Sequence, residues 1–294
     1  MIIQKLEKQG LIQPPKWLAD NTAYLTIMGS NAYAVASDNS DMDIYGFCLP
    51  PRDIVFPHLA GEIPGFGRQQ QRFEQWQQHH IQTSDGKEYD FSVYSIVKYV
   101  NLCMENNPNL IDSLFVPRRC IIHSTPLSEH LRENRKLFLH KGAWHKFKGY
   151  SYSQMTKMRN KSHAENPKRA ADIARIGYDS KFAYHIIRLI SEVEQILVEG
   201  DLDLERNREQ LKSVRRGEWT LQQIEQWFQD KERDLESVYL SSTLPYAPDE
   251  AKIKQLLLDC LEMHYGDIST AINREVNVDA LLRDMQTVIN RYGS

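Results

Sequence analysis

The sequence predicts an α+β fold, in which a mixed sheet with helices in the first part of the chain is followed by an α-helical part. Short segments with strand-like composition, separated by turns, lie before residue 95. From about residue 126 onward, long amphipathic segments follow one another without strand signals between them. The length of 294 residues allows two domains or one large one. We therefore expect domains over residues 1–125 and 126–294, without a Gly/Ser-rich linker between them.

The first part is expected to alternate between strands and short helices. Residues 15–20 predict a short helix before the first strand, and the Pro50-Pro51 pair ends the second strand. Ser84-Asp85-Gly86 is a turn signal that predicts a hairpin between the third and fourth strands. The expected strands cover residues 24–28, 41–49, 68–82 and 87–94, and the further helices cover residues 95–105 and 110–115.

The second part is expected to contain helices only. In each of its segments the apolar residues recur with helical spacing, which gives a helix one apolar face for packing. The segments cover residues 126–140, 142–163, 166–176, 179–199, 220–238, 249–264 and 278–292.

The stretch that indicates chemistry is Met28-Gly29-Ser30, followed by Asp41-Met42-Asp43-Ile44. Alternate residues of a strand share a face, so Asp41 and Asp43 are expected to project from the same side. Two convergent carboxylates behind a Gly-Ser turn suit a hard divalent cation that carries the phosphates of a nucleotide. A protein without that task has little reason to place two like charges side by side on a strand.

Asp90 is the candidate for a third carboxylate. It lies on the returning strand of the expected hairpin, and a strand placed beside that of Asp43 would bring it to the same metal site. Glu88 has the same parity along the strand and is the alternative. His79 and His80 also suggest a metal, but adjacent strand residues face opposite ways, so we do not expect them to share a site.

Positive charge is concentrated in one part of the chain. The net charge is -3, yet residues 136–188 contain 12 Lys and Arg against three acids. Polyanion binding and a solvated basic helix face both explain such a block. On one predicted helix, Lys181, His185 and Arg188 share a face opposite the apolar one, which suits a triphosphate or an RNA backbone. The alternative is a solvated face on which Lys181 and Arg188 pair with nearby acids such as Glu192.

The remaining sequence features indicate a cytoplasmic protein. The four cysteines are scattered and lack the spacing of a zinc site, so we expect reduced thiols. No apolar run is long enough to span a membrane, and the first residues lack the apolar core of a signal peptide. We therefore expect no membrane partner.

The turn and the carboxylate pair resemble the signature of the DNA polymerase β-like nucleotidyltransferase superfamily. That signature is a hydrophobic residue, Gly-Ser or Gly-Gly, a short spacer, and an acid-hydrophobic-acid-hydrophobic run. The stretch from Gly29 to Gly46 is similar to a subset of predicted bacterial and phage nucleotidyltransferases associated with RNA repair. Later segments resemble the subset too: Asp90-Phe91-Ser92, Asn107-Pro108-Asn109 and Gly177-Tyr178-Asp179. No GxxxxGK[ST] motif surrounds Gly29-Ser30, so P-loop chemistry is not supported.

The resemblance implies a fold and a reaction. A polymerase β-like palm would cover residues 1–125, and the helical domain over residues 126–294 would help to hold the triphosphate and the acceptor. With Mg²⁺ or Mn²⁺, such an enzyme transfers a nucleoside monophosphate from an NTP to a hydroxyl group and releases pyrophosphate.

The resemblance also implies the roles of individual residues. Asp41, Asp43 and Asp90 would bind the metal ions and act in catalysis. The triphosphate would be held by Gly29, Ser30, Lys181 and His185, and Tyr33 is a further candidate for a nucleotide contact.

The basic block favours an RNA or tRNA end as the acceptor, while a protein hydroxyl and a small molecule remain open. An alternative of another class is a non-catalytic nucleotide- or RNA-binding module, or a toxin–antitoxin partner. Retention of all three candidate carboxylates argues against that alternative, since a binding module needs no two-metal site.

Overall fold

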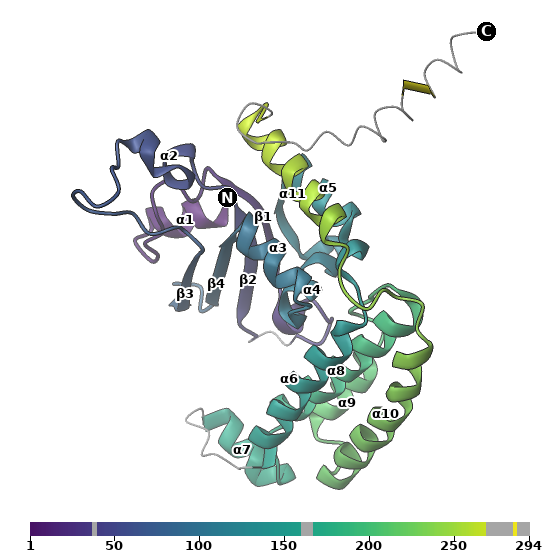
Figure 1. The fold of residues 1–294 in the computed structure, drawn as a ribbon. Helices are drawn as coiled ribbons and strands as arrows, with labels where there is room; N and C mark the ends of the chain where they lie inside the picture. The colour runs from purple at the N-terminus through teal and green to yellow at the C-terminus, as the bar shows by residue number, and fades with distance from the viewer. Residues whose placement is uncertain (37–39, 160–166, 269–284, 287–294) are drawn as a thin grey trace.

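The computed structural model describes residues 1–36, 40–159, 167–268 and 285–286. A β-sheet with short helices forms the N-terminal part of the structure, and long helices form the C-terminal part (Figure 1). The predicted α+β fold is therefore confirmed.

Within the described residues the sheet has five strands in the order β3-β4-β2-β1-β5. The neighbours β2 and β4 are parallel, and the other neighbouring pairs are antiparallel. The strands are β1 (Thr22–Ile27), β2 (Met42–Cys48), β3 (Gln75–Gln82), β4 (Glu88–Ser95) and β5 (Ile121–Ser124). The four expected strands are present. Sequence analysis did not find β5, because four residues at a sheet edge carry almost no periodic signal.

Short helices accompany the sheet. They are α1 (Ile2–Lys8), η1 (Gly29–Asn31), α2 (Arg52–Val55), η2 (Pro57–Ala60), α3 (Ile96–Met104), α4 (Pro108–Phe115), η3 (Arg118–Cys120), α5 (Pro126–Glu133) and η4 (Arg135–Phe138). The two helices expected after β4 are confirmed as α3 and α4. The helix expected over residues 15–20 was wrong: residues 16–20 form turns, because so short a segment gains few helical hydrogen bonds.

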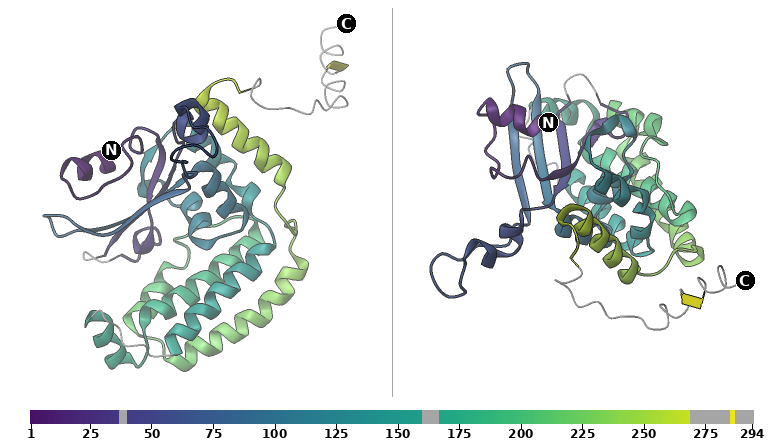
Figure 2. Two further views of the ribbon diagram at one scale, coloured as in Figure 1. Left: turned by 60° about the vertical axis from the view of Figure 1, so that its left-hand side comes forward. Right: turned by 90° about the horizontal axis from the view of Figure 1, so that it is seen from above.

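The two faces of the sheet are covered differently. On one face α1 inserts Ile3 and Leu6 into a small apolar cluster that also contains Ile44 and Phe91 of the sheet. The other face belongs to the main hydrophobic core, to which α3, α4 and α5 contribute. Figure 2 shows the strands between α1 and the longer helices.

The longer helices pack around α8. They are α6 (Gly142–Arg159), α7 (Pro167–Ile176), α8 (Ser180–Glu199), α9 (Arg208–Arg216), α10 (Leu221–Ser241) and α11 (Glu250–Tyr265). The Asp179 side chain caps α8 by accepting the N–H of Lys181, and Gly200 ends the helix in a left-handed conformation. Because α8 packs against α6, α9 and α10, most of its residues are buried.

Two differences between the expected and the described helices need comment. Sequence analysis did not find α9, because this short, strongly charged helix buries only Leu211 and Val214. The helix expected over residues 278–292 lies outside the described residues, apart from residues 285–286.

The main hydrophobic core continues across the expected domain boundary. Tyr24 and Phe47 of the sheet belong to the same cluster of buried residues as Trp144 of α6 and Ile190 of α8. The last strand ends at Ser124 and α5 begins at Pro126, which agrees with a change of architecture near residue 125. The division into domains over residues 1–125 and 126–294 stays a prediction.

A buried ionic network joins the two parts of the structure. Arg188 of α8 lies 3.4 Å from the carboxylate of Asp112 in α4 and 3.7 Å from that of Glu192. The Tyr33 hydroxyl donates to Asp112 over 2.5 Å and accepts a hydrogen bond from Arg188. Burial raises the pKa of the Asp112 carboxyl to about 6 and that of Glu192 well above its usual range, while Arg188 opposes both shifts. The guanidinium is thus the cation that makes two buried acids tolerable.

We expect Arg188→Met to destabilise the protein by about 3 kcal/mol, because it leaves Asp112 and Glu192 buried without their cation. The free energy of unfolding in urea measures this effect. Arg233→Met is the matched control: Arg233 is 73% exposed and pairs with Asp230 at the surface, so its loss should change little. Equal stability of the two variants would contradict a stabilising role of the network.

Candidate active site

The Gly29-Ser30 turn forms η1 directly after β1. Gly29 has a φ of +61°, a left-handed conformation that glycine adopts without steric cost. A Cβ at Gly29 would lie 2.0 Å from Oδ2 of Asp43. The N–H of Met28 donates to the carbonyl of Asp43 over 2.7 Å, which fixes the turn against β2. The absence of a side chain at Gly29 therefore lets the backbone of the turn lie against the Asp43 carboxylate.

Asp43 and Asp90 are direct partners on the parallel strands β2 and β4. Residues in register on neighbouring strands project from the same face, so the two carboxylates lie on one side of the sheet. The strand of Asp90 thus lies beside that of Asp43, as expected from the sequence. Asp41 precedes the first residue of β2 and is exposed.

The charges around Asp43 act on its carboxyl group. Burial, followed by the negative charge of Asp90, raises the pKa of Asp43 to about 6, and Asp41 adds to the rise. Lys181 and His79 oppose it. Carboxylate oxygens are the ligands that a hard divalent cation such as Mg²⁺ prefers. The positive charge of the cation would also relieve the repulsion between the carboxylates. These residues fit the cation that the sequence resemblance implies.

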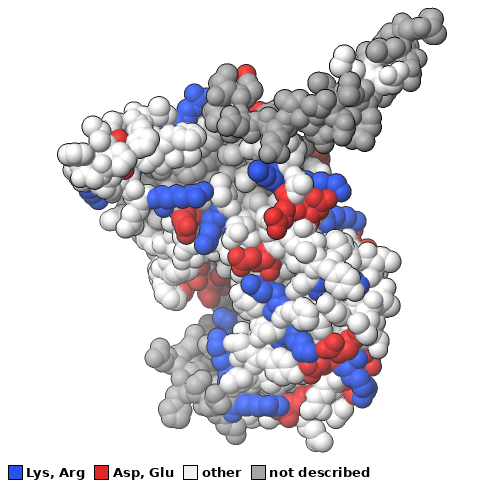
Figure 3. Space-filling model, viewed as in Figure 1, with Lys and Arg blue, Asp and Glu red and all other residues white. Residues whose placement is uncertain are grey.

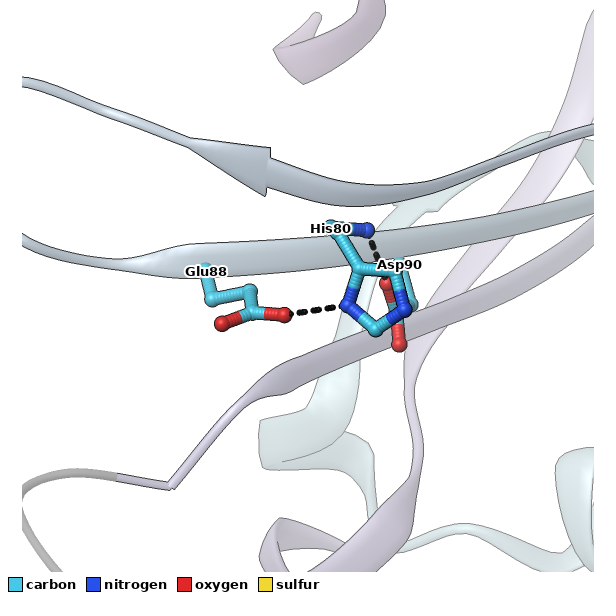
Figure 4. A group of neighbouring side chains, drawn as sticks. All are labelled: His80, Glu88 and Asp90. Atoms are coloured by element: carbon cyan, nitrogen blue, oxygen red, sulfur yellow. Dashed lines mark hydrogen bonds and ion pairs between the residues drawn. The ribbon is translucent and has the colours of Figure 1, made fainter. Parts of the chain in front are cut away.

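Side chains of the types that can hold a metal ion gather around Asp90. Within the described residues, one ligand atom each of His80, Glu88 and Asp90 lie within 4.8 Å of one another. Figure 4 shows the His80 ring directed at Glu88, while the backbone N–H of His80 donates to Asp90. The three acids Asp41, Asp43 and Asp90 do not form a group this tight in the described structure, and their joint role as metal ligands stays a prediction.

The expectation that His79 and His80 face opposite ways was wrong. The register of β3 against β4 shifts between Gln78 and Ile81, so two histidines stand opposite the single residue Asp90. His80 has a φ of +56°, which is uncommon for a residue other than glycine. As a result, His79 Nδ1 lies 3.6 Å from Asp90 Oδ1, and His80 Nδ1 lies 2.7 Å from Glu88 Oε1. The strand alternation used for the prediction fails at this bulge.

The residues expected on one face of α8 lie in different surroundings. Lys181 is exposed at the first turn of the helix and acts on the Asp43 carboxyl, whereas His185 is half-buried, with its ring 5.1 Å from that of Tyr184. Arg188 is buried in the ionic network, so its place on an open phosphate-binding face was wrong. It pairs with Glu192 as in the alternative, but in the interior and not on a solvated face. The triphosphate roles of Lys181 and His185 stay predictions.

The prediction for Tyr33 was also wrong. Its side chain is 1% exposed, and its hydroxyl is hydrogen-bonded to Asp112 and Arg188. Tyr33 therefore anchors the segment after the Gly-Ser turn instead of offering a surface to a nucleotide.

Two further arginines hold the turn segment. Arg119 donates to the carbonyl of Asn31 over 3.0 Å, and Arg215 of α9 donates to the carbonyl of Val35 over 3.0 Å. Sequence analysis did not find them, because each is far along the chain from the backbone group that it binds. The contact of Arg215 connects the segment after the turn to α9.

The basic block is partly neutralised in space. Among the residues that the structure describes, five of its cations form ion pairs with acids outside the block: Lys136 with Asp201, Lys146 with Glu105, Lys148 with Glu232 and Glu236, Arg159 with Glu225, and Arg188 with Asp112 and Glu192. The net positive charge that the block presents at the surface is therefore smaller than its sequence alone indicates. In Figure 3, acidic side chains at the lower end of the sheet face Lys and Arg side chains of the helical part across a hollow.

The comparisons with known proteins identify the family. A family described as "RNA repair pathway DNA polymerase beta family" matches residues 18–259. A nucleotidyltransferase-like protein from Exiguobacterium sibiricum is a similar solved structure: 9% identity, 98% of this chain and 89% of that chain covered, and a TM-score of 0.29. No curated protein matches the sequence. Among the helices that the structure describes, none has both the length and the apolar character needed to cross a membrane. Since the family match spans most of the chain, the protein belongs to the RNA repair pathway DNA polymerase β family and is a nucleotidyltransferase.

Proposed function

We propose that the protein uses Mg²⁺ or Mn²⁺ to transfer a nucleoside monophosphate from an NTP to a hydroxyl group at an RNA end. The observation that carries the proposal is the in-register pair Asp43 and Asp90, of which Asp43 lies against the Gly29 turn and within the electrostatic reach of Lys181. Acids, a tight turn and a cation are the groups that nucleotidyl transfer needs, since the reaction depends on positioning and charge neutralisation.

The triphosphate has a proposed place beside η1. Backbone N–H groups of Gly29 and Ser30, with the Ser30 hydroxyl, would donate hydrogen bonds to phosphate oxygens. Lys181 would add a positive charge from the first turn of α8, and His185 would act one turn further along the helix. In this proposal α8 completes the site of the N-terminal part.

Asp41, Asp43 and Asp90 are the proposed ligands of the divalent cations. When bound, such cations neutralise the phosphate charge and favour attack by the acceptor hydroxyl. In the reaction the acceptor oxygen bonds to the α-phosphorus, the bond to the pyrophosphate oxygen breaks, and pyrophosphate leaves. Asp90 would accept the proton that the acceptor hydroxyl loses.

RNA is the proposed acceptor chiefly because the family is described as belonging to an RNA repair pathway. The exposed Lys157 and Lys181 on the helical part add cations for an RNA backbone, such as that of a tRNA end. We place the reaction in the cytoplasm, since all four cysteines are buried free thiols, as expected in a reducing compartment. A protein hydroxyl or a small molecule as acceptor is an outcome that the labelling experiment below distinguishes.

We expect Asp43→Asn and Asp90→Asn each to lower nucleotidyl transfer about a hundredfold or more, because each removes charge that the transition state requires. Each of the four NTPs, labelled at the α-phosphate, is incubated with the protein and total RNA, and the labelled product is identified by gel. Asp85→Asn, in the exposed hairpin turn, is the matched control and should retain activity. Undiminished transfer by Asp43→Asn would contradict the assignment of the site. Labelled protein or a labelled small molecule, in place of labelled RNA, would show that the acceptor is not RNA.

We expect Gly29→Ala to lower transfer at least about tenfold, because the new methyl group would displace the Asp43 carboxylate. Gly86→Ala is a matched control, since Gly86 also has a positive φ, of +78°, but has no atom within 4 Å of the added Cβ. Both variants carry the same kind of backbone cost, and only Gly29→Ala touches the site. Equal activity of the two variants would show that the contact between Gly29 and Asp43 is unimportant for the reaction. The initial rate with labelled NTP is the measurement.

A further inference from the structure

The bulge in β3 creates a cluster of mixed ligands next to the proposed catalytic acids. The cluster offers one imidazole nitrogen and two carboxylate oxygens, all within 4.8 Å of one another. They come from His80, Glu88 and Asp90. His79 adds a second imidazole, with Nδ1 3.6 Å from Asp90 Oδ1. A regular strand would turn one of the two histidines away, so the extra residue of the bulge is what gathers these donors.

The accessibility of the cluster suits an ion that arrives from solvent. The His80 side chain is 83% exposed, whereas those of Glu88 and Asp90 are 25% and 24% exposed. The acids are held in place, because Gln82 donates to Glu88 over 2.6 Å and the backbone N–H of His80 donates to Asp90 over 2.7 Å. Ligand atoms within 4.8 Å of one another are close enough to share an ion at the distance of about 2 Å at which Zn²⁺ binds nitrogen and oxygen ligands.

We propose that His80, Glu88 and Asp90 bind a divalent transition-metal ion, for which Zn²⁺ matches the donors best. Mixed imidazole and carboxylate ligands favour such ions over Mg²⁺, which prefers oxygen ligands alone. A water molecule or His79 would complete the four ligands that Zn²⁺ usually takes. The site is distinct from the one formed by Asp41 and Asp43 and goes beyond the proposed function, although Asp90 belongs to both. An ion here would hold the Asp90 side chain at the edge of the active site.

Zinc binding is measured on the full-length protein with ZnCl₂ and a zinc indicator, in excess Mg²⁺ and without nucleotide. We expect His80→Gly and Glu88→Gln each to weaken the binding of one Zn²⁺ at least about tenfold, since each removes a ligand. Glycine adopts the positive φ of position 80 without cost, so the bulge is kept, and glutamine keeps the shape of Glu88.

Two control variants separate this site from other places where zinc could bind. His130→Ala removes a half-buried histidine that lies 3.9 Å from Asp259, and should not change the affinity. Asp41→Asn changes the proposed catalytic site without removing a donor of the zinc cluster, and it should retain the zinc ion lost in the first two variants. In crystals soaked with ZnCl₂, we expect an anomalous zinc peak between His80, Glu88 and Asp90.

Two results would overturn the proposal. One is zinc uptake by His80→Gly equal to that of the unchanged protein, and the other is no zinc uptake by the unchanged protein. Either result would leave His80 as a simple ion-pair partner of Glu88. Because the assay contains no nucleotide, failure of zinc binding and failure of nucleotidyl transfer are observed separately.

Discussion

The parallel pairing of β2 with β4 is the constraint on which the candidate site depends. It places Asp43 and Asp90 opposite one another, a like-charge pair that normally destabilises a sheet. The cost is visible in the Asp43 carboxyl, whose pKa is raised to about 6 by burial and by Asp90. A fold that keeps such a pair needs positive charge nearby, and Lys181 supplies part of it from α8. A divalent cation carried by a nucleotide would supply the remaining positive charge. The repulsion between the two acids and the proposed reaction would then have the same cation in common.

The turn that faces these acids is held by residues from much later in the chain. Gly29 brings the backbone against Asp43, and the following segment is fixed by Arg119, Arg188 and Arg215, directly or through Tyr33. Because two of these arginines lie on α8 and α9, the helical part stabilises the geometry of the site in addition to supplying Lys181. The continuous core around Tyr24 and Ile190 agrees with this mutual dependence.

Local sequence patterns predicted the features of the site that depend on neighbouring residues in the chain. The Gly29 turn, the strand of Asp43 and the hairpin that carries Asp90 were all predictable, because each depends on neighbouring residues. That the strand of Asp90 would lie beside that of Asp43 was only an expectation, and the register of the two residues was not predicted, since pairing of parallel strands depends on packing between distant segments. The bulge at His80 and the burial of Arg188 were predicted wrongly, because ideal strand and helix periodicity cannot reveal a register shift or a long-range ionic network. The roles of Ser30 and His185 remain predictions.

Stability against pH, with and without Mg²⁺, tests most directly whether the paired acids form a cation site. The pKa of Asp43 is about 6 in the folded protein against 3.8 for an unperturbed carboxyl, so the unfolded state releases the proton first as the pH rises. In EDTA, the free energy of unfolding should therefore fall between pH 4 and pH 6 through this group, by about 1–3 kcal/mol. Asp43→Asn should lack this fall and be the more stable protein at neutral pH, whereas Mg²⁺ with an NTP should restore the stability of the unchanged protein alone. Identical pH profiles of the two proteins, with no response to Mg²⁺ and NTP, would contradict the account.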